Sequence, residues 1–187
     1  MGQRITRQEP VQLFFAIMAR EDDIFDRAEA EIEAAWSPIH MRDDFYDFDP
    51  LTTYYKTEFG TGLRKRIVAV RDLIDPEELV DIKIRTNEME DKISNSSGDA
   101  PRIVNIDPGY LNFGKIVLAS TKDHWHRLYI GQGIFAELTL RYQRAGKGYT
   151  PLEWTYPDYK MPERLDFFAR LRQDYRERLR ASENQAP

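Results

Sequence analysis

The side chains that could bind or transform a small molecule are concentrated in residues 102–142 of this chain. If residues 134–142 form a strand, its alternation places Glu137 and Arg141 on one face. A turn at residues 131–133 then brings the preceding strand alongside. Such a face is typical of a half-solvated antiparallel strand, and it also suits a small-molecule site, so both interpretations stay open.

The functional interpretation is an anion site. Arg127 lies on the hairpin with Arg141, Lys122 is nearby, and Glu137 is the acid that faces them. One carboxylate among three cations leaves an excess of positive charge in a chain whose net charge is −5. Because a guanidinium binds carboxylate or phosphate through two parallel hydrogen bonds, we expect a small phosphorylated or carboxylated ligand. The further candidates for binding it are Lys115, Tyr156 and Asp158.

The same segment could also catalyse a reaction. His126 would be the general acid and base, since histidine titrates near neutral pH, and Asp107 or Glu137 would orient its ring. The rival hypotheses are a protein-interaction or scaffold domain without catalysis and, more weakly, RNA binding on the sheet. Against RNA, the chain has no aromatic pair at the strand positions required, and its net charge is negative.

Two histidines are weak candidates for metal ligands. His124 and His126 share a face if their segment is extended, and that spacing is compatible with one metal ion. No acid stands at a fixed spacing that would complete a known metal motif. We therefore expect neither a metal ion nor another cofactor.

Residues 109–115, GYLNFGK, have the glycine and lysine spacing of a phosphate-binding loop. Ile116 follows, where that loop needs a hydroxyl to bind magnesium, and bulky side chains crowd the positions where backbone amides must converge. We therefore expect no magnesium-dependent GTP or ATP binding at this loop. The sequence instead indicates a turn at residues 107–109 and a helical position for Lys115.

Periodicity predicts the elements that must position these residues. They alternate as strand, helix, strand, strand, helix and strand, at residues 11–18, 22–36, 39–48, 65–70, 75–93 and 102–106. Asp75, Pro76 and Glu78 give the second helix a clear start signal. This order is typical of a ferredoxin-like arrangement, an antiparallel sheet with both helices on one face. The other sheet face then needs cover or a ligand.

The rest of the chain could supply that cover. Residues 111–121 have helical or strand character, residues 127–142 indicate a hairpin, and Pro162 begins a last helix. We therefore predict one α+β domain with three parts: a ferredoxin-like βαββαβ core at residues 11–107, an added β-hairpin and C-terminal helix at residues 108–181, and a disordered tail at residues 182–187.

Composition narrows the class of protein. Of 187 residues, 41% are hydrophobic and 32% charged, the balance of a globular domain. The negative net charge argues against DNA or a membrane surface as a partner. The first apolar run, at residues 11–19, is too short to span a bilayer. Cysteine is absent, which excludes disulfides and thiolate metal sites and leads us to expect a cytoplasmic protein. Oligomeric state is left open.

Several motifs along the chain together resemble one family. The longest are residues 105–111 (NIDPGYL), 133–142 (GIFAELTLRY) and 154–159 (WTYPDY), with shorter ones at residues 75–78, 120–123 and 126–127. In this order they resemble the family known as domain of unknown function 4416, over nearly the whole chain. The resemblance implies a prokaryotic, cytoplasmic, single-domain protein without an assigned activity, and it transfers no catalytic residues.

Overall fold

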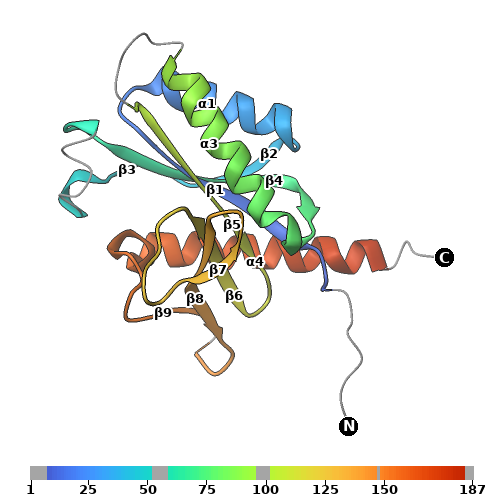
Figure 1. Ribbon diagram of the computed structural model, residues 1–187. Helices are drawn as coiled ribbons and strands as arrows, with labels where there is room; N and C mark the ends of the chain where they lie inside the picture. The colour runs from blue at the N-terminus through green and yellow to red at the C-terminus, as the bar shows by residue number, and fades with distance from the viewer. Residues whose placement is uncertain (1–7, 52–58, 96–101, 147, 184–187) are drawn as a thin grey trace.

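The computed structural model describes residues 8–51, 59–95, 102–146 and 148–183 (Figure 1). Within them the fold is α+β, with an antiparallel sheet of nine strands. The helices are α1 (Asp22–Ala35), α3 (Leu79–Asn95) and α4 (Pro162–Glu183), with 3-10 turns η1 (Asp49–Leu51), η2 (Pro76–Glu78) and η3 (Pro157–Lys160). The strands are β1 (Val11–Ala19), β2 (Ile39–Arg42), β3 (Tyr46–Asp47), β4 (Arg64–Ile74), β5 (Val104–Leu111), β6 (Lys115–Ser120), β7 (Leu128–Gly131), β8 (Ile134–Gln143) and β9 (Gly148–Pro151).

The strands follow the order β2-β4-β1-β5-β6-β8-β7, while β3 pairs with β4 and β9 pairs with β8. Neighbouring strands run antiparallel throughout. β1 lies inside the sheet, and all nine of its residues are buried. Its sequence is apolar on both faces, as a strand covered from both sides requires.

Helices α1 and α3 pack on the same face of the sheet. Their apolar side chains, among them Ile32 of α1 and Met89 of α3, form one core with alternate residues of β1. The prediction that these two helices share a face is therefore confirmed. The predicted start signal is confirmed as well: Asp75 and Glu78 form a reciprocal capping box at η2, which leads directly into α3.

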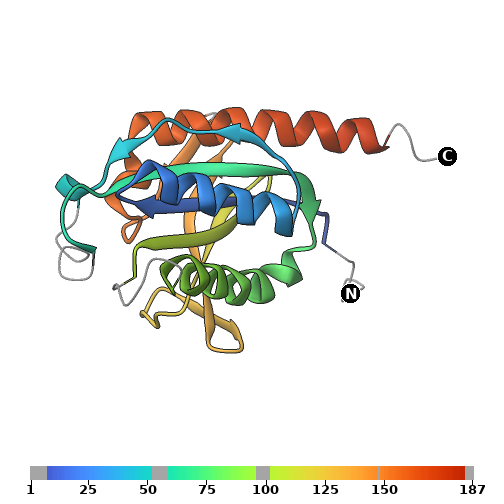
Figure 2. The ribbon, with the colours of Figure 1, turned by 90° about the horizontal axis from the view of Figure 1, so that it is seen from above.

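Helix α4 covers the opposite face, and Figure 2 shows α3 and α4 on opposite sides of the sheet. Phe168 of α4 contacts Phe14 of β1 edge-on, with ring centroids 5.2 Å apart. The core beneath α4 also takes up Leu111 of β5 and Leu140 of β8, so it joins the first strands to the later ones. The cover expected for this face is thus mainly one long helix.

Two local predictions about residues 107–115 are wrong. Residues 107–109 do not turn but continue β5, because Pro108 sits where the outer edge of the strand needs no N–H donor. Gly109 is required at the next position, since an added Cβ would lie 2.6 Å from both Phe14 Cζ and the Val117 carbonyl oxygen. Lys115 is not helical but begins β6.

The C-terminal boundary also differs from the prediction. The tail expected at residues 182–187 begins too early, because α4 continues to Glu183, while residues 184–187 lie outside the described residues. Across the part of the chain that the structure describes, no helix is both long enough and apolar enough to cross a membrane.

Candidate functional site

The candidate site lies where β6 diverges from β5. β5 pairs with β1 along its whole length, but β6 pairs only with its last three residues. The outer edge of residues 104–108 therefore needs other hydrogen-bond partners. Helix α3 supplies them at Ile106: Glu90 Oε1 accepts from its backbone N–H at 2.5 Å, and Lys83 Nζ donates to its carbonyl oxygen at 3.1 Å.

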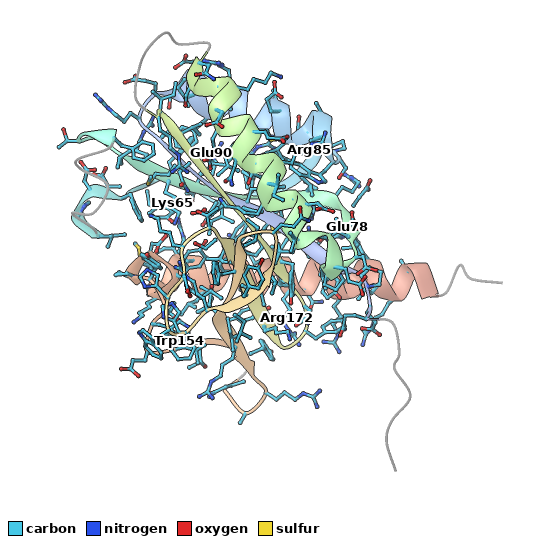
Figure 3. All side chains as sticks on the ribbon, in the orientation of Figure 1. Lys65, Glu78, Arg85, Glu90, Trp154 and Arg172 are labelled. Atoms are coloured by element: carbon cyan, nitrogen blue, oxygen red, sulfur yellow. The ribbon has the colours of Figure 1, made fainter. Side chains whose placement is uncertain are left out.

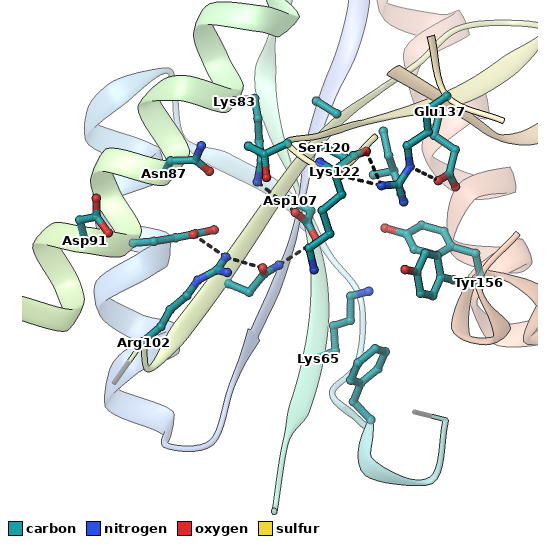
Figure 4. Close-up of a pocket in the computed structure, with 18 residues that line it drawn as sticks. Lys65, Lys83, Asn87, Asp91, Arg102, Asp107, Ser120, Lys122, Glu137 and Tyr156 are labelled. Carbon is teal, nitrogen blue, oxygen red and sulfur yellow. Dashed lines mark hydrogen bonds and ion pairs between the residues drawn. The ribbon is translucent and has the colours of Figure 1, made fainter. Parts of the chain in front are cut away.

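This divergence leaves a cavity of about 290 Å³ (Figure 4). Five basic and four acidic side chains line it, from α3, β4, β5 and β8 and from the segments just before β5 and after β6. They are Lys65, Lys83, Arg102, Lys122, Arg127, Glu90, Asp91, Asp107 and Glu137. In a chain with 27 basic and 32 acidic residues, this lining reverses the overall balance of charge.

Strand register brings the polar residues of the cavity floor together. Lys65 of β4 and Asn105 of β5 lie opposite the same residue of β1, Met18, on its two sides. Asp107 follows Asn105 on the same face, in register with Ala16. Figure 3 places Lys65 and Glu90 toward the same end of the molecule, away from Glu78. The starts of β4 and β5 thus form one polar floor.

A chain of hydrogen bonds connects α3 to this floor. Arg102 Nη2 donates to Glu90 Oε2 and to Asn105 Oδ1, both at 2.5 Å. Asn105 Nδ2 donates to Asp107 Oδ2 at 2.7 Å, and Lys83 Nζ donates to Asp107 Oδ1 at 3.0 Å. Both carboxylates of this wall are therefore held by a cation and by a neutral donor.

The two carboxyl groups of this wall are shifted in opposite directions. Burial raises the pKa of Glu90 to about 7, although Lys83 and Arg102 oppose the shift. Burial also acts on Asp107, but Lys83 and Lys65 outweigh it, so the pKa of Asp107 falls below its usual 3.8. Near neutral pH, Asp107 is therefore ionised while Glu90 is partly protonated.

The opposite wall comes from the segments around β6, β7 and β8. Arg127 Nε donates to Glu137 Oε2 at 2.9 Å, and its Nη1 donates to Ser120 Oγ and to the Lys122 carbonyl oxygen, each at 2.9 Å. Figure 4 shows the Lys122 side chain extending into the cavity. Arg127, Glu137 and Lys122 thus meet at this wall, as the hairpin register had suggested.

At the base of the cavity, Lys65 connects to a buried carboxylate. Lys65 Nζ lies 2.6 Å from Asp158 Oδ2, and the Tyr46 hydroxyl donates to the same oxygen at 2.9 Å. Asp158 is almost fully buried and does not line the cavity, whereas Tyr156, two residues earlier, does. Of these two sequence candidates, only Tyr156 is positioned to touch a ligand directly.

His126 and His124 lie beside the cavity rather than on it. His126 Nε2 lies 3.1 Å from Glu137 Oε2, and its ring stacks between those of His124 and Trp154, with centroids 5.7 and 5.5 Å away. No group of three metal-ligating side chains gathers among the described residues. The Glu137 contact anticipated for His126 is present, but it joins a stack of rings to the back of the cavity wall.

Arg141 and Lys115 lie elsewhere. Arg141 pairs with Lys115 across β8 and β6, beyond a bulge at which Thr139 has no partner on β6. The inserted residue shifts the alternation, so Glu137 and Leu140 are both buried while Arg141 is exposed. The prediction that Glu137 and Arg141 share a face is therefore wrong.

Five charged residues of the cavity were not predicted from the sequence: Lys65, Lys83, Glu90, Asp91 and Arg102. A signal existed for two of them, because Lys83 and Glu90 are seven residues apart on α3, next to its buried stripe. Charged residues that share the period of an apolar stripe are buried with it. For Lys65, which begins an apolar run, the sequence holds no comparable signal.

The arrangement can hold a small polar molecule. Lys65 and Lys83 are buried, and each ammonium has three N–H donors. Within the described residues, Lys65 Nζ makes one hydrogen bond and Lys83 Nζ makes two. Because buried polar groups are normally hydrogen-bonded, the remaining N–H donors of these two cations require an acceptor inside the cavity.

Comparisons with known proteins place the chain in a family. Searches of curated proteins and of solved structures returned no match. The family described as "Domain of unknown function (DUF4416)" matches residues 9–175, which is most of the chain and includes both walls of the cavity. The resemblance drawn from the sequence motifs is confirmed, and the chain belongs to this family.

Proposed function

We propose that the cavity between α3, β5 and the later strands binds a small anionic ligand. The observation that carries the proposal is the pair of buried ammonium groups of Lys65 and Lys83. Both line one cavity, and each has N–H donors without an acceptor among the described residues. Lys65 Nζ also lies 4.8 and 5.0 Å from the ring centroids of Phe48 and Tyr159. These cation–π contacts stabilise the ammonium charge, but they do not replace a hydrogen-bond acceptor. A ligand carboxylate or phosphate would supply the missing acceptors.

Binding is better supported than catalysis. His126, the candidate acid and base, does not line the cavity and is stacked between two rings. Asp107 and Glu137 both line it, yet each accepts from a cation that already neutralises it. We therefore assign Asp107 and Glu137 the role of holding Lys83 and Arg127 in place. Lys122 and Tyr156 would meet the ligand directly.

A thermal-shift screen followed by calorimetry tests this proposal, with phosphorylated and carboxylated metabolites as probes. A ligand at one hundred times its Kd stabilises the folded state by about 2.7 kcal/mol. For a chain of this size, that stabilisation raises Tm by roughly 5–10 °C. Lys122→Ala should weaken binding about tenfold through loss of a charge-assisted hydrogen bond.

Lys115→Ala is the matched control, because Lys115 is an exposed lysine remote from the cavity. It should leave the affinity unchanged. The proposal fails if no anion shifts Tm, or if both lysine variants lose affinity equally.

A second function, protein interaction, is favoured by one observation. Trp125, Leu128 and Tyr129 are 78%, 74% and 64% exposed, on β7 and the segment before it. Exposed apolar patches mark interaction surfaces more often than chance would give. Sedimentation of the wild type and of Trp125→Ser tests this second function: a complex that forms only with Trp125 supports it, and a monomer at all concentrations opposes self-association.

We also propose that the first part of the fold is ferredoxin-like. The order β2-β4-β1-β5, with α1 and α3 on one face, supports classing this part as ferredoxin-like. RNA binding on the other sheet face has little support, since α4 buries most of that face. A cytoplasmic location goes with the proposal, because the chain has no cysteine and a small anionic metabolite is its expected ligand.

A further inference from the structure

The mouth of the cavity holds a second kind of group. Asn87 and Asp91 lie one helical turn apart on α3, on the side of the helix that also presents Lys83 to the cavity. Thr121 and Tyr156 line the opposite side. Within the described residues, none of these four side chains makes a hydrogen bond or an ion pair. Their bonding capacity is available to a ligand.

The chemistry of these four groups selects the ligand atoms that face them. A carboxylate only accepts hydrogen bonds, so the partner of Asp91 must be a donor, and a bare phosphate would be repelled there. The amide of Asn87 and the hydroxyls of Thr121 and Tyr156 are neutral and can both donate and accept. Hydroxyl groups match this set, because they too donate and accept without charge.

An ammonium group on the ligand fits less well. It would need several carboxylates that are not already neutralised, and the other acids of the cavity are engaged. Glu90 accepts from Arg102, Asp107 from Lys83, and Glu137 from Arg127. Asp91, which is exposed to solvent, would face such an ammonium alone.

The size of the cavity limits the ligand further. Its volume of about 290 Å³ lies just below the usual range of small-molecule pockets, about 300–1,000 Å³. A single sugar ring or a short polyol fits that space better than a dinucleotide. The ring of Tyr156, about 39% exposed at the mouth, offers an apolar face to the C–H groups of such a ligand.

On these grounds we infer that the ligand is a hydroxylated anion of monosaccharide size, such as a sugar phosphate or a sugar acid. The inference rests on the proposed function, since it assigns the anionic group to Lys65 and Lys83. The hydroxyls face Asn87 and Asp91 on one side of the mouth and Thr121 and Tyr156 on the other. Phosphate and carboxylate are the two sources of the charge, and the experiment separates them.

The test is calorimetry of the full-length protein with glucose 6-phosphate, gluconate, inorganic phosphate and glucose. We expect glucose 6-phosphate or gluconate to bind at least about tenfold tighter than inorganic phosphate, and glucose to bind more weakly than both. Asp91→Ala should weaken the hydroxylated anion about tenfold. The same variant should leave inorganic phosphate unchanged or strengthen it, because a like charge is removed.

Glu88→Ala is the matched control, since Glu88 is an exposed acid on the same helix that does not line the cavity. It should change neither affinity. The inference is overturned, with the proposed function intact, if inorganic phosphate binds as tightly as the hydroxylated anions or if Asp91→Ala weakens both alike. Serine, which carries an ammonium group as well as a carboxylate, is an additional probe. The inference is also overturned if serine binds better than gluconate. If no anion binds at all, the proposed function itself fails.

Discussion

The sheet face that α4 approaches has two ends that differ in chemistry. Toward the end of β5, Leu111 joins Phe14 of β1 and Phe168 of α4 in an apolar core. Toward its start, Asn105 and Asp107 occupy the same face, beside Lys65 of β4, and line a cavity. Residues of both ends lie on the same face of the same strands, so the geometry of the sheet alone does not create the site.

The difference comes from what covers each end. α4 lies over the apolar end, and a long amphipathic helix can bury a strand face completely. At the polar end β6 no longer pairs with β5, and side chains of α3 make the hydrogen bonds that a neighbouring strand would make. A buried ion pair shows the contrast: the side chains of Arg164 and Asp43 are both 4% exposed, and neither lines this cavity. Buried charge becomes a candidate site only where the cover is incomplete.

The largest effect should follow from opening the apolar end. Phe168→Ala removes a fully buried ring and should cost about 3–5 kcal/mol of unfolding free energy. Denaturant unfolding would measure this loss. Anion affinity of the folded fraction should not change, because Phe168 does not line the cavity. A stability loss below about 1 kcal/mol would mean that α4 is not the main cover of this face.

The next effect concerns the boundary between the two ends. Lys65→Ala leaves the buried carboxylate of Asp158 with the Tyr46 hydroxyl as its hydrogen-bond donor and should cost about 3 kcal/mol. Lys65→Met combined with Asp158→Asn removes both charges and should recover most of that stability. Chemical denaturation of the wild type and of these two variants checks the comparison. Equal losses in the single and double variants would show that the ion pair contributes nothing beyond packing.

A smaller effect should appear with pH, and it belongs to the polar end. The pKa of Glu90 is about 7 in the folded state and is expected near 4.5 when unfolded. Between these values the folded state binds more protons, so the unfolding free energy falls as pH rises. The stability that Glu90 contributes is therefore full below pH 4.5 and lost as pH passes 7, and about 2–3 kcal/mol of it should be lost between pH 5 and 8.

Glu90→Gln should remove this dependence, which thermal or denaturant unfolding at pH 5, 6, 7 and 8 would reveal. The pKa of Asp43 is also raised by burial, to about 6, but Asp43 titrates in both proteins and cancels in the difference. If the wild type and the variant show parallel profiles, Glu90 does not titrate in this range and its environment favours the carboxylate.

Much of the fold could be predicted from the sequence because its signals are local. The helix at α3 follows from the Asp75 cap and Pro76, and the buried strand β1 from its apolar run. The course of residues 107–115 could not be predicted this way. Pro108 and Gly109 usually mark a turn. Here Pro108 suits the part of the β5 outer edge that β6 does not pair with, and Gly109 suits the close approach of Phe14 and Val117.

The candidate site was predictable only in part, for a related reason. Arg127, Lys122 and Glu137 lie within one short stretch of the chain, where the turn at residues 131–133 folds Arg127 back beside Glu137. Lys65, Lys83 and Arg102 reach the cavity from three other segments, and only the register about Met18 and the packing of α3 join them. Such long-range pairing leaves no mark on spacing within one segment. The bulge at Thr139 is the reason that simple alternation predicted the wrong face for Arg141.

Arg141 therefore gives the smallest expected effect and a direct check on the bulge. If Glu137 and Arg141 shared a face, Arg141→Ala would abolish anion binding. Because Arg141 is exposed beyond the bulge and does not line the cavity, the substitution should leave affinity unchanged. Stability should change by no more than about 0.5 kcal/mol, as for other surface positions. Calorimetry and denaturation of Arg141→Ala beside Lys122→Ala decide the point. If Arg141→Ala loses binding and Lys122→Ala does not, the anion site lies at the far end of β8, and the cavity beside α3 is not the site.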